Sequence, residues 1–121
     1  MVIGTDAPML PHQLRRIARR GAIGIGRNGT PGGNNSGDIF LAFSTANDVT
    51  LKALRGGRRQ AFSYMPDDCF DPFYLATVQA VEEAVVNALV AAEDMTTIKP
   101  EGSVCRAIDH AQLRAALGLQ G

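Results

Sequence analysis

The sequence is poor in the residues that mark several protein classes. It has no tryptophan, only two cysteines and no net charge, because twelve basic residues balance twelve acidic ones. Proteins that bind nucleic acid broadly carry a basic excess, so that class is disfavoured and we expect no nucleic-acid partner. Cys69 and Cys105 have neither CxxC nor zinc-ligand spacing, which argues against a disulfide framework and a zinc ribbon. We expect a reducing, cytoplasmic compartment, no metal and no cofactor.

Long apolar runs are also missing. No uninterrupted apolar stretch approaches the roughly 18 residues of a membrane span, and the amino terminus has no basic start. We therefore expect no membrane association and no signal peptide. The chain does contain 45% hydrophobic and 20% charged residues, which is ordinary for a globular protein and excludes a disordered one. The length predicts a single domain, or part of one, over residues 1–121.

Apolar patterning predicts a mixture of strands and helices. We expect buried strands over residues 1–5 and 39–45, because both are nearly continuous apolar runs, and the second is expected to be buried on both faces. Apolar residues at helical spacing predict helices over residues 11–27 and 72–93, and a short helix that begins at Ile108-Asp109 and ends at Gly118.

The predicted helix over residues 11–27 carries three glycines, which lower its helix propensity. Small residues would also let this helix lie close against a sheet or a second helix. Arginines at positions 15, 16, 19 and 20 flank its apolar stripe, and such a face is more often solvated, or paired with acidic groups elsewhere in an assembly, than bound to phosphates or acidic partners. The polar segment 46–63 is expected to be a flexible linker or an exposed hairpin.

The densest group of functional residue types is the loop from Arg27 to Asp38. Its four glycines, three asparagines and one proline cannot form regular structure, and it leads directly into the apolar run that follows. Asn34, Asn35, Ser36 and Asp38 can supply amides, a hydroxyl and a carboxylate. Ser36 and Asp38 are two residues apart, so in an extended segment their side chains share one face and could handle a proton or an ammonium group. Spacing alone favours the alternative, a loop whose Asn and Ser side chains cap their own turns.

Two other features have weaker functional interpretations. The glycine-rich loop superficially resembles a phosphate-binding loop, but it follows a helix and precedes a strand, and no GK[ST] follows. His12 and His110 have no partner at a metal-ligand or catalytic-triad spacing, so we expect surface or capping roles for them. Nucleotide binding is accordingly the weakest of the functional hypotheses.

Three segments carry a family resemblance: TDAPMLP at residues 5–11, GNNSGDIFLAFSTAN at residues 33–47, and the long predicted helix from Asp71 to Glu93. Together they resemble the carboxy-terminal, or β, part of the DmpA-type L-aminopeptidase/D-esterase family, which includes the β-peptidyl aminopeptidases. The first segment is similar to the stretch just after the family's self-cleavage point. The second is the family's most distinctive motif and is highly specific.

In that family a precursor cuts itself into two chains, and the new amino-terminal serine of the second chain is the nucleophile. The resemblance implies an α+β fold, part of a layered α/β/β/α sandwich resembling N-terminal-nucleophile hydrolases. It implies hydrolysis of a peptide or aminoacyl amide beside a free amino terminus, through an acyl-enzyme. Ser36 matches the motif serine that hydrogen-bonds the nucleophile, and Asp38 matches the acid that holds its ammonium or orients the relay. Asn34 and Asn35 would support the loop or the substrate.

The resemblance also implies partners. Counting back along the first segment places the nucleophilic serine a few residues before Met1, and no residue here corresponds to the family's oxyanion donors. We expect residues 1–121 to be a β-chain fragment that is inactive alone, is partnered by an α chain of the same precursor or of a split gene, and forms a homo-oligomer of αβ units. Produced alone, it should self-associate or dissolve poorly. The alternative of a different class is a non-enzymatic assembly or regulatory domain that has kept the fold and lost the chemistry.

Overall fold

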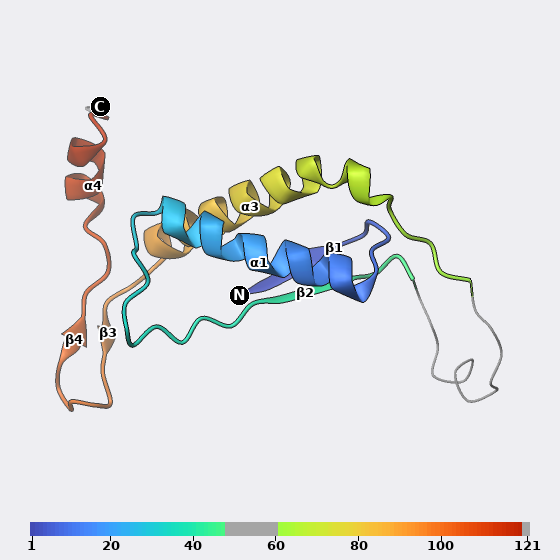
Figure 1. Ribbon diagram of the computed structural model, residues 1–121. Helices are drawn as coiled ribbons and strands as arrows, with labels where there is room; N and C mark the ends of the chain where they lie inside the picture. The colour runs from blue at the N-terminus through green and yellow to red at the C-terminus, as the bar shows by residue number, and fades with distance from the viewer. Residues whose placement is uncertain (48–60, 120–121) are drawn as a thin grey trace. The chain divides into compact units, whose positions relative to one another are not determined.

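The computed structural model describes residues 1–47 and 61–119, and it mixes helices with strands as expected for an α+β protein (Figure 1). Most of the predicted linker or hairpin over residues 46–63 lies outside the described residues. The elements, in chain order, are β1 (Val2–Thr5), α1 (Pro11–Arg27), β2 (Leu41–Ser44), the short 3-10 helix η1 (Asp67–Cys69), α3 (Asp71–Val90), β3 (Met95–Thr96), β4 (Val104–Cys105) and α4 (His110–Ala116).

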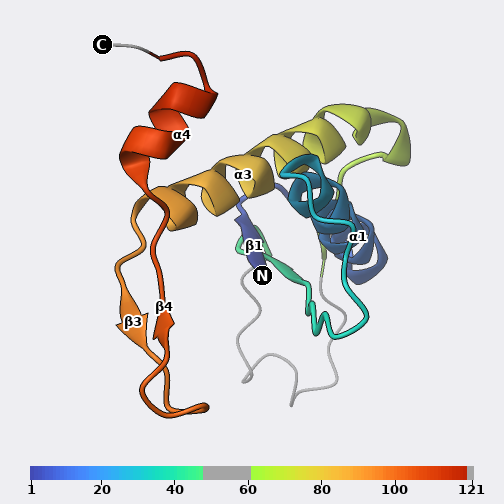
Figure 2. The same cartoon turned by 90° about the vertical axis from the view of Figure 1, so that its left-hand side faces the viewer.

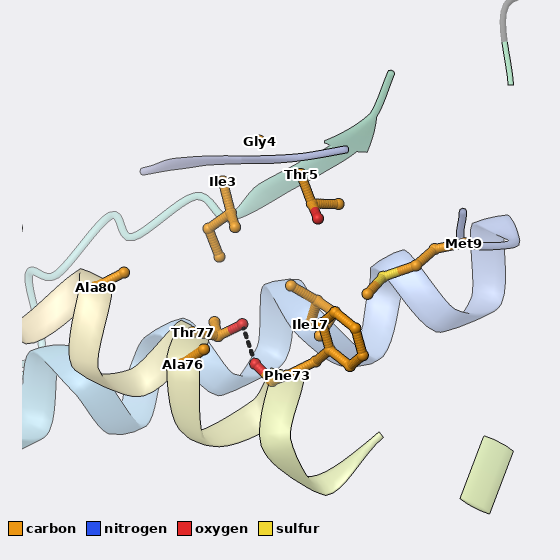
Figure 3. Close-up of a pocket in the computed structure, with 9 residues that line it drawn as sticks. All are labelled: Ile3, Gly4, Thr5, Met9, Ile17, Phe73, Ala76, Thr77 and Ala80. Carbon is orange, nitrogen blue, oxygen red and sulfur yellow. Dashed lines mark hydrogen bonds between the residues drawn. The ribbon is translucent and has the colours of Figure 1, made fainter. Parts of the chain in front are cut away.

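The strands β1 and β2 form a parallel pair, with Val2 opposite Leu41 and Thr5 opposite Ser44. Both strands were predicted, but the prediction that they are buried is wrong for the described residues. Side chains alternate between the two faces of the pair. One face lies toward the helices, where Ile3 is half-buried (Figure 3), while Val2, Leu41 and Phe43 on the other face are 64%, 55% and 46% exposed. The described residues supply a layer of helices on one face only.

Helix α1 has the predicted bounds, and its glycines make the predicted close approaches. A Cβ atom added at Gly21 would meet the Met1 side chain and would lie 3.0 Å from Cδ1 of Phe40. At Gly24, an added Cβ would lie 2.7 Å from Cβ of Val81 in α3. Gly26 differs, because an added Cβ there would meet nothing within 4 Å. Small residues at two of the three positions therefore allow α1 to pack closely on β1, β2 and α3.

Gln13 is a buried polar residue of α1 that the hydrophobic pattern did not predict. Its side chain is 1% exposed. Its Oε1 accepts a hydrogen bond from the backbone N–H of Leu10 at 2.9 Å, and its Nε2 donates to the Met65 carbonyl oxygen at 2.8 Å and to Oδ1 of Asp67 at 2.9 Å. These bonds satisfy the amide and join the start of α1 to the segment before α3.

The core of residues 1–82 consists of Met9, Ile17 and Phe70, with partly buried residues around them. The Phe70 ring lies 5.9 Å from the Phe73 ring and 5.7 Å from the Tyr74 ring, in tilted arrangements that aromatic side chains favour. The turn that leads into α3 is therefore fixed by aromatic packing.

Helix α3 begins one residue before its predicted start and ends three residues before its predicted end. Its buried residues are Thr77, Val78 and Val81. Among the described residues it is the one helix long and apolar enough, by length and composition, to cross a membrane, a test that the core helix of a soluble protein also passes. Part of the apolar surface of α3 is covered by α1, because Gly24 of α1 lies against Val81 of α3.

The chain divides into two compact units, residues 1–82 and 83–121. The boundary falls inside α3, so the expectation of a single domain stays a prediction. The second unit contains an antiparallel pairing of β3 with β4, followed by α4 (Figure 2). The apolar pattern did not indicate this pairing, because strands of two residues leave no alternating pattern.

Side-chain hydrogen bonds define the second unit. Both carboxylate oxygens of Asp94 are used, one by the Arg106 guanidinium at 3.1 Å and one by the Ala107 N–H at 2.8 Å. Asp109 caps the predicted short helix α4 by accepting from two backbone N–H groups of its first turn. Nε2 of His110 lies 2.9 Å from the carbonyl oxygen of Val90 at the end of α3, which matches the capping role expected for this histidine.

Candidate functional site

The loop that precedes β2 brings Ser36 and Asp38 together. The Ser36 hydroxyl donates a hydrogen bond to Oδ2 of Asp38 over 2.8 Å, as expected for residues two apart on one face. The backbone N–H of Ser36 donates to the Gly33 carbonyl oxygen at 2.8 Å, which closes the turn before the pair. Both side chains are exposed in the described part of the chain.

The amino end of β1 lies beside this pair. The amino group of Met1 donates to the carbonyl oxygen of Ile39 at 2.7 Å, and the N–H of Leu41 donates to the Met1 carbonyl oxygen at 3.0 Å. Ile39 directly follows Asp38 in the sequence. The parallel register therefore places Ser36 and Asp38 at the same end of the strand pair as the start of β1.

Asn34 and Asn35 lie in an exposed turn of the same loop. Within the described residues, neither side-chain amide makes a hydrogen bond to the protein. The self-capping alternative holds for a different asparagine: Nδ2 of Asn28 donates to the Gly24 carbonyl oxygen at 3.0 Å and caps the end of α1. The roles of Asn34, Asn35, Ser36 and Asp38 in the resemblance stay predictions.

A hollow of about 280 Å³ lies between the last turns of α1 and the loop, and Asp38 is part of its wall. We call it the α1-end hollow, and its lining residues are Ala22, Ile25, Gly26, Thr30, Pro31, Gly32 and Asp38. Ala22 and Ile25 belong to the apolar stripe of the predicted helix. The hollow itself was not predicted, because no pattern within the sequence shows that the loop turns back beside α1.

A second hollow, of about 170 Å³, lies between β1 and the two helices α1 and α3 (Figure 3). Among the residues that the structure describes, no titratable side chain lines its wall. The Thr77 hydroxyl, its one buried polar group, donates to the Phe73 carbonyl oxygen at 2.7 Å, as Figure 3 shows. With its polar atoms already paired, this hollow offers packing space rather than chemistry.

Arg16 and Arg20 of α1 have partners within their own chain. Arg16 lies 3.2 Å from Asp67, and the guanidinium of Arg20 lies 4.0 Å from the centre of the Tyr74 ring. The hydrogen bond from Gln13 and the charge of Arg16 lower the pKa of Asp67 below its ordinary value. Arg16 thus pairs with an acidic group of its own chain, and pairing of this face with acidic groups elsewhere in an assembly stays a prediction.

The remaining titratable residues offer little chemistry in the described part of the chain. Partial desolvation and the neighbouring Asp68 carboxylate raise the pKa of the exposed Cys69 thiol, which makes it a poor nucleophile. Three or more metal-ligating side chains are not brought together anywhere in residues 1–47 or 61–119. The Ser36–Asp38 pair at the strand ends is thus the arrangement best suited to moving a proton or holding an ammonium group.

Comparison with known proteins agrees with the resemblance found in the sequence. Residues 1–102 match the family described as Peptidase family S58. Beta-peptidyl aminopeptidase BapA from Sphingosinicella microcystinivorans is 48% identical over 117 residues, which is 97% of this chain and 28% of that protein.

Solved structures give the same result. The chain superposes with a TM-score of 0.85 and 52% identity on the L-aminopeptidase D-Ala-esterase/amidase from Ochrobactrum anthropi. That protein is a serine aminopeptidase with a variant of the Ntn hydrolase fold. The match covers 97% of this chain and 32% of that one. A Burkholderia sp. beta-aminopeptidase superposes with a TM-score of 0.82 and 38% identity, covering 97% of this chain and 34% of that one. The expected N-terminal-nucleophile hydrolase fold is confirmed, and the chain spans about a third or less of the length of these relatives.

Proposed function

Because this chain belongs to peptidase family S58, we propose that residues 1–121 form the β-chain part of a serine aminopeptidase. The reaction is hydrolysis of an amide or ester next to a free amino terminus. A serine hydroxyl from outside these residues attacks the carbonyl carbon, the amine or alcohol leaves, and water releases the acyl group from the serine. The observation that carries the proposal is the Ser36–Asp38 hydrogen bond at the amino end of β1.

The parallel register supports this placement. Val2 is opposite Leu41, and the Met1 amino group is bonded to Ile39. Any polypeptide joined to Met1 on its amino side would, in the same register, run alongside residues 36–39. A serine a few residues ahead of Met1 would then lie within reach of the hydroxyl of Ser36 and the carboxylate of Asp38.

Each member of the pair has a distinct role in the proposal. The carboxylate of Asp38 accepts hydrogen bonds from the ammonium group of the nucleophilic serine and holds the Ser36 hydroxyl in place. Attack requires the uncharged form of that amine: the Ser36 hydroxyl accepts the proton that the nucleophilic hydroxyl loses and passes its own proton to the amine, which becomes the ammonium that Asp38 holds. The relay is needed because an unassisted serine hydroxyl is a weak nucleophile at neutral pH. The ammonium then returns this proton to the leaving amine or alcohol. Asn34 and Asn35 present their side-chain amides to the substrate or support the loop.

The proposal includes a partner polypeptide. The chain corresponds to 28% of one curated relative and 32% of a solved one, so most of each relative has no counterpart here. The face of the strand pair that carries Val2, Leu41 and Phe43 is exposed, although parallel strands are usually covered on both faces. We assign this face to the α chain, whose residues supply the oxyanion donors, and we expect residues 1–121 alone to be inactive.

A chimera tests the proposed function. The segment of the Ochrobactrum anthropi enzyme that superposes on residues 1–121 is replaced by these residues, which are 52% identical to it. We expect the chimera to hydrolyse alanine p-nitroanilide, and we expect residues 1–121 alone to give no turnover. A folded chimera without hydrolysis would favour the non-enzymatic assembly domain, and rapid turnover by residues 1–121 alone would overturn the need for a partner.

A further inference from the structure

We propose that Asn28 and Gly29 form a latent self-modification site. The end of α1 holds the site unreactive, and opening of that end lets Asn28 convert to aspartate and isoaspartate. The inference goes beyond the proposed function and does not depend on it. Asn28 is the one asparagine of the sequence that glycine follows. Because glycine has no Cβ, its peptide nitrogen can approach the preceding side chain with little hindrance.

The reaction needs no reagent other than water. The backbone nitrogen of Gly29 attacks Cγ of Asn28, so that a bond forms between these two atoms and the bond from Cγ to Nδ2 breaks. The side-chain nitrogen leaves as ammonia, with the proton that the backbone nitrogen gives up. Water then opens the succinimide ring at either of its two carbonyl carbons. One opening gives aspartate, and the other gives isoaspartate, in which the main chain runs through Cγ.

Two hydrogen bonds at the end of α1 hold back both reacting groups. Nδ2 of Asn28 donates to the Gly24 carbonyl oxygen at 3.0 Å, which directs the side-chain amide back along the helix. The Gly29 N–H donates to the Gly26 carbonyl oxygen at 3.0 Å, so the proton that must leave during the attack is held in a hydrogen bond. The site is therefore closed while the helix end is intact, and it reacts only when both bonds are broken.

The surroundings of the site allow the helix end to open. Asn28 and Gly29 are both exposed, and a Cβ atom added at Gly29 would meet nothing within 4 Å, so water can reach the ring. The last turn of α1 is tied to α3 by an ion pair in which Nε of Arg27 lies 2.9 Å from Oε2 of Glu82. Helix ends are among the least stable parts of a fold. Loss of this ion pair should therefore increase the fraction of chains in which the site is open.

The modification cannot be reversed by closing the helix again. Either product has a carboxylate in place of the amide, and a carboxylate cannot donate a hydrogen bond to the Gly24 carbonyl oxygen. Its charge is also opposed by the partial negative charge at the carboxyl end of a helix. Isoaspartate in addition lengthens the main chain by one carbon atom, just ahead of the loop that carries Ser36 and Asp38.

Peptide mapping by mass spectrometry of the 121-residue chain, incubated at pH 8, tests the inference without any activity assay. We expect Asn28 to convert about tenfold or more slowly in the folded chain than in urea, because two hydrogen bonds must first be broken. Glu82→Gln should raise the rate in the folded chain by about two- to fivefold, the effect of losing an exposed ion pair. It should leave the rate in urea unchanged, since Glu82 is distant from Asn28 in the sequence.

Glu83→Gln is the matched control, because Glu83 is exposed and belongs to none of the ion pairs among the described residues. It should leave the rate at Asn28 unchanged. Asn35 is an internal control for shielding by self-association: it is exposed on the same loop, and among the described residues its side chain makes no hydrogen bond.

Three results would overturn the inference. Equal rates at Asn28 in the folded chain and in urea would show that the helix end gives no protection. Equal slowing of Asn35 on folding would attribute the protection to self-association instead of the helix end. Equal rates in Glu82→Gln and Glu83→Gln would show that the ion pair does not control the opening.

Discussion

Gly24 of α1 and Val81 of α3 lie so close that no side chain fits between them. A Cβ atom built on Gly24 would be 2.7 Å from Cβ of Val81 and 2.8 Å from the backbone oxygen of Val78. Since backbone atoms cannot turn aside as a flexible side chain does, glycine at this position sets the separation of the two helices that lie beneath the strand pair.

Gly24→Ala is therefore expected to lower the free energy of unfolding by about 1–3 kcal/mol, the usual cost of overpacking. Gly26→Ala, two residues further along the same helix, should instead raise it by about 0.5–1 kcal/mol, because its methyl group is unobstructed and alanine is the better helix former. Urea denaturation of both variants measures the difference. Equal effects of the two substitutions would contradict the close packing at Gly24.

Gln13→Met is expected to destabilise the protein although methionine has a similar shape. The Leu10 N–H, the Met65 carbonyl and Asp67 each lose a partner, and a buried polar group left unpaired costs about 1–3 kcal/mol. Gln112→Met, at an exposed position of α4, is the control and should change little. The same denaturation midpoint for both variants would show that the Gln13 network contributes nothing.

Asp67 makes the stability of the protein depend on pH. The Gln13 hydrogen bond and the Arg16 charge lower the pKa of Asp67 in the folded state. Its stabilising effect is thus present above the ordinary carboxyl pKa, about 3.9, and is lost as the pH falls through the lower folded-state value. Asp67→Asn should be less stable than the unmodified chain at pH 7, and the gap should narrow toward pH 3. A stability difference between the two proteins that stays constant from pH 7 to pH 3 would contradict a stabilising effect of the Asp67 carboxylate that is lost on protonation.

Cys69 is expected to react slowly with alkylating reagents. Partial desolvation and the Asp68 carboxylate raise the pKa of its thiol, whose sulfur lies 3.7 Å from Oδ1 of Asp68. In a Cys105→Ala background, Asp68→Asn should increase the rate of Cys69 alkylation by iodoacetamide at pH 8, because it removes one of the two causes. A rate that stays the same or falls would show that Asp68 does not influence the thiol.

Local features of the sequence predicted the helices well. Pro11 and the apolar spacing after it gave α1 its bounds, and Asp109 and Gly118 bracketed the short helix α4. The glycines of α1 correctly indicated close packing, and Ser36 and Asp38 proved to be hydrogen-bonded to each other. These outcomes depend on a few neighbouring residues, which is why a single sequence was sufficient.

The failed predictions depend on distant parts of the chain. Strands β1 and β2 read as fully buried, yet Leu41 and Phe43 are exposed, because an apolar run shows that a face will be covered but not which residues cover it. No local pattern indicates the burial of Gln13, because two of its three hydrogen-bond partners lie more than fifty residues away. The α1-end hollow was missed for the same reason.

The most direct test of the account is the hydrolysis of alanine p-nitroanilide by the chimera after substitution at the paired residues. Ser36→Ala and Asp38→Asn should each lower kcat/KM by about 100-fold or more, the usual contribution of a positioned proton-transfer group. Ser63→Ala, an exposed serine outside the site, should leave kcat/KM unchanged. Full activity in both Ser36→Ala and Asp38→Asn would show that the pair takes no part in the reaction and would contradict the account.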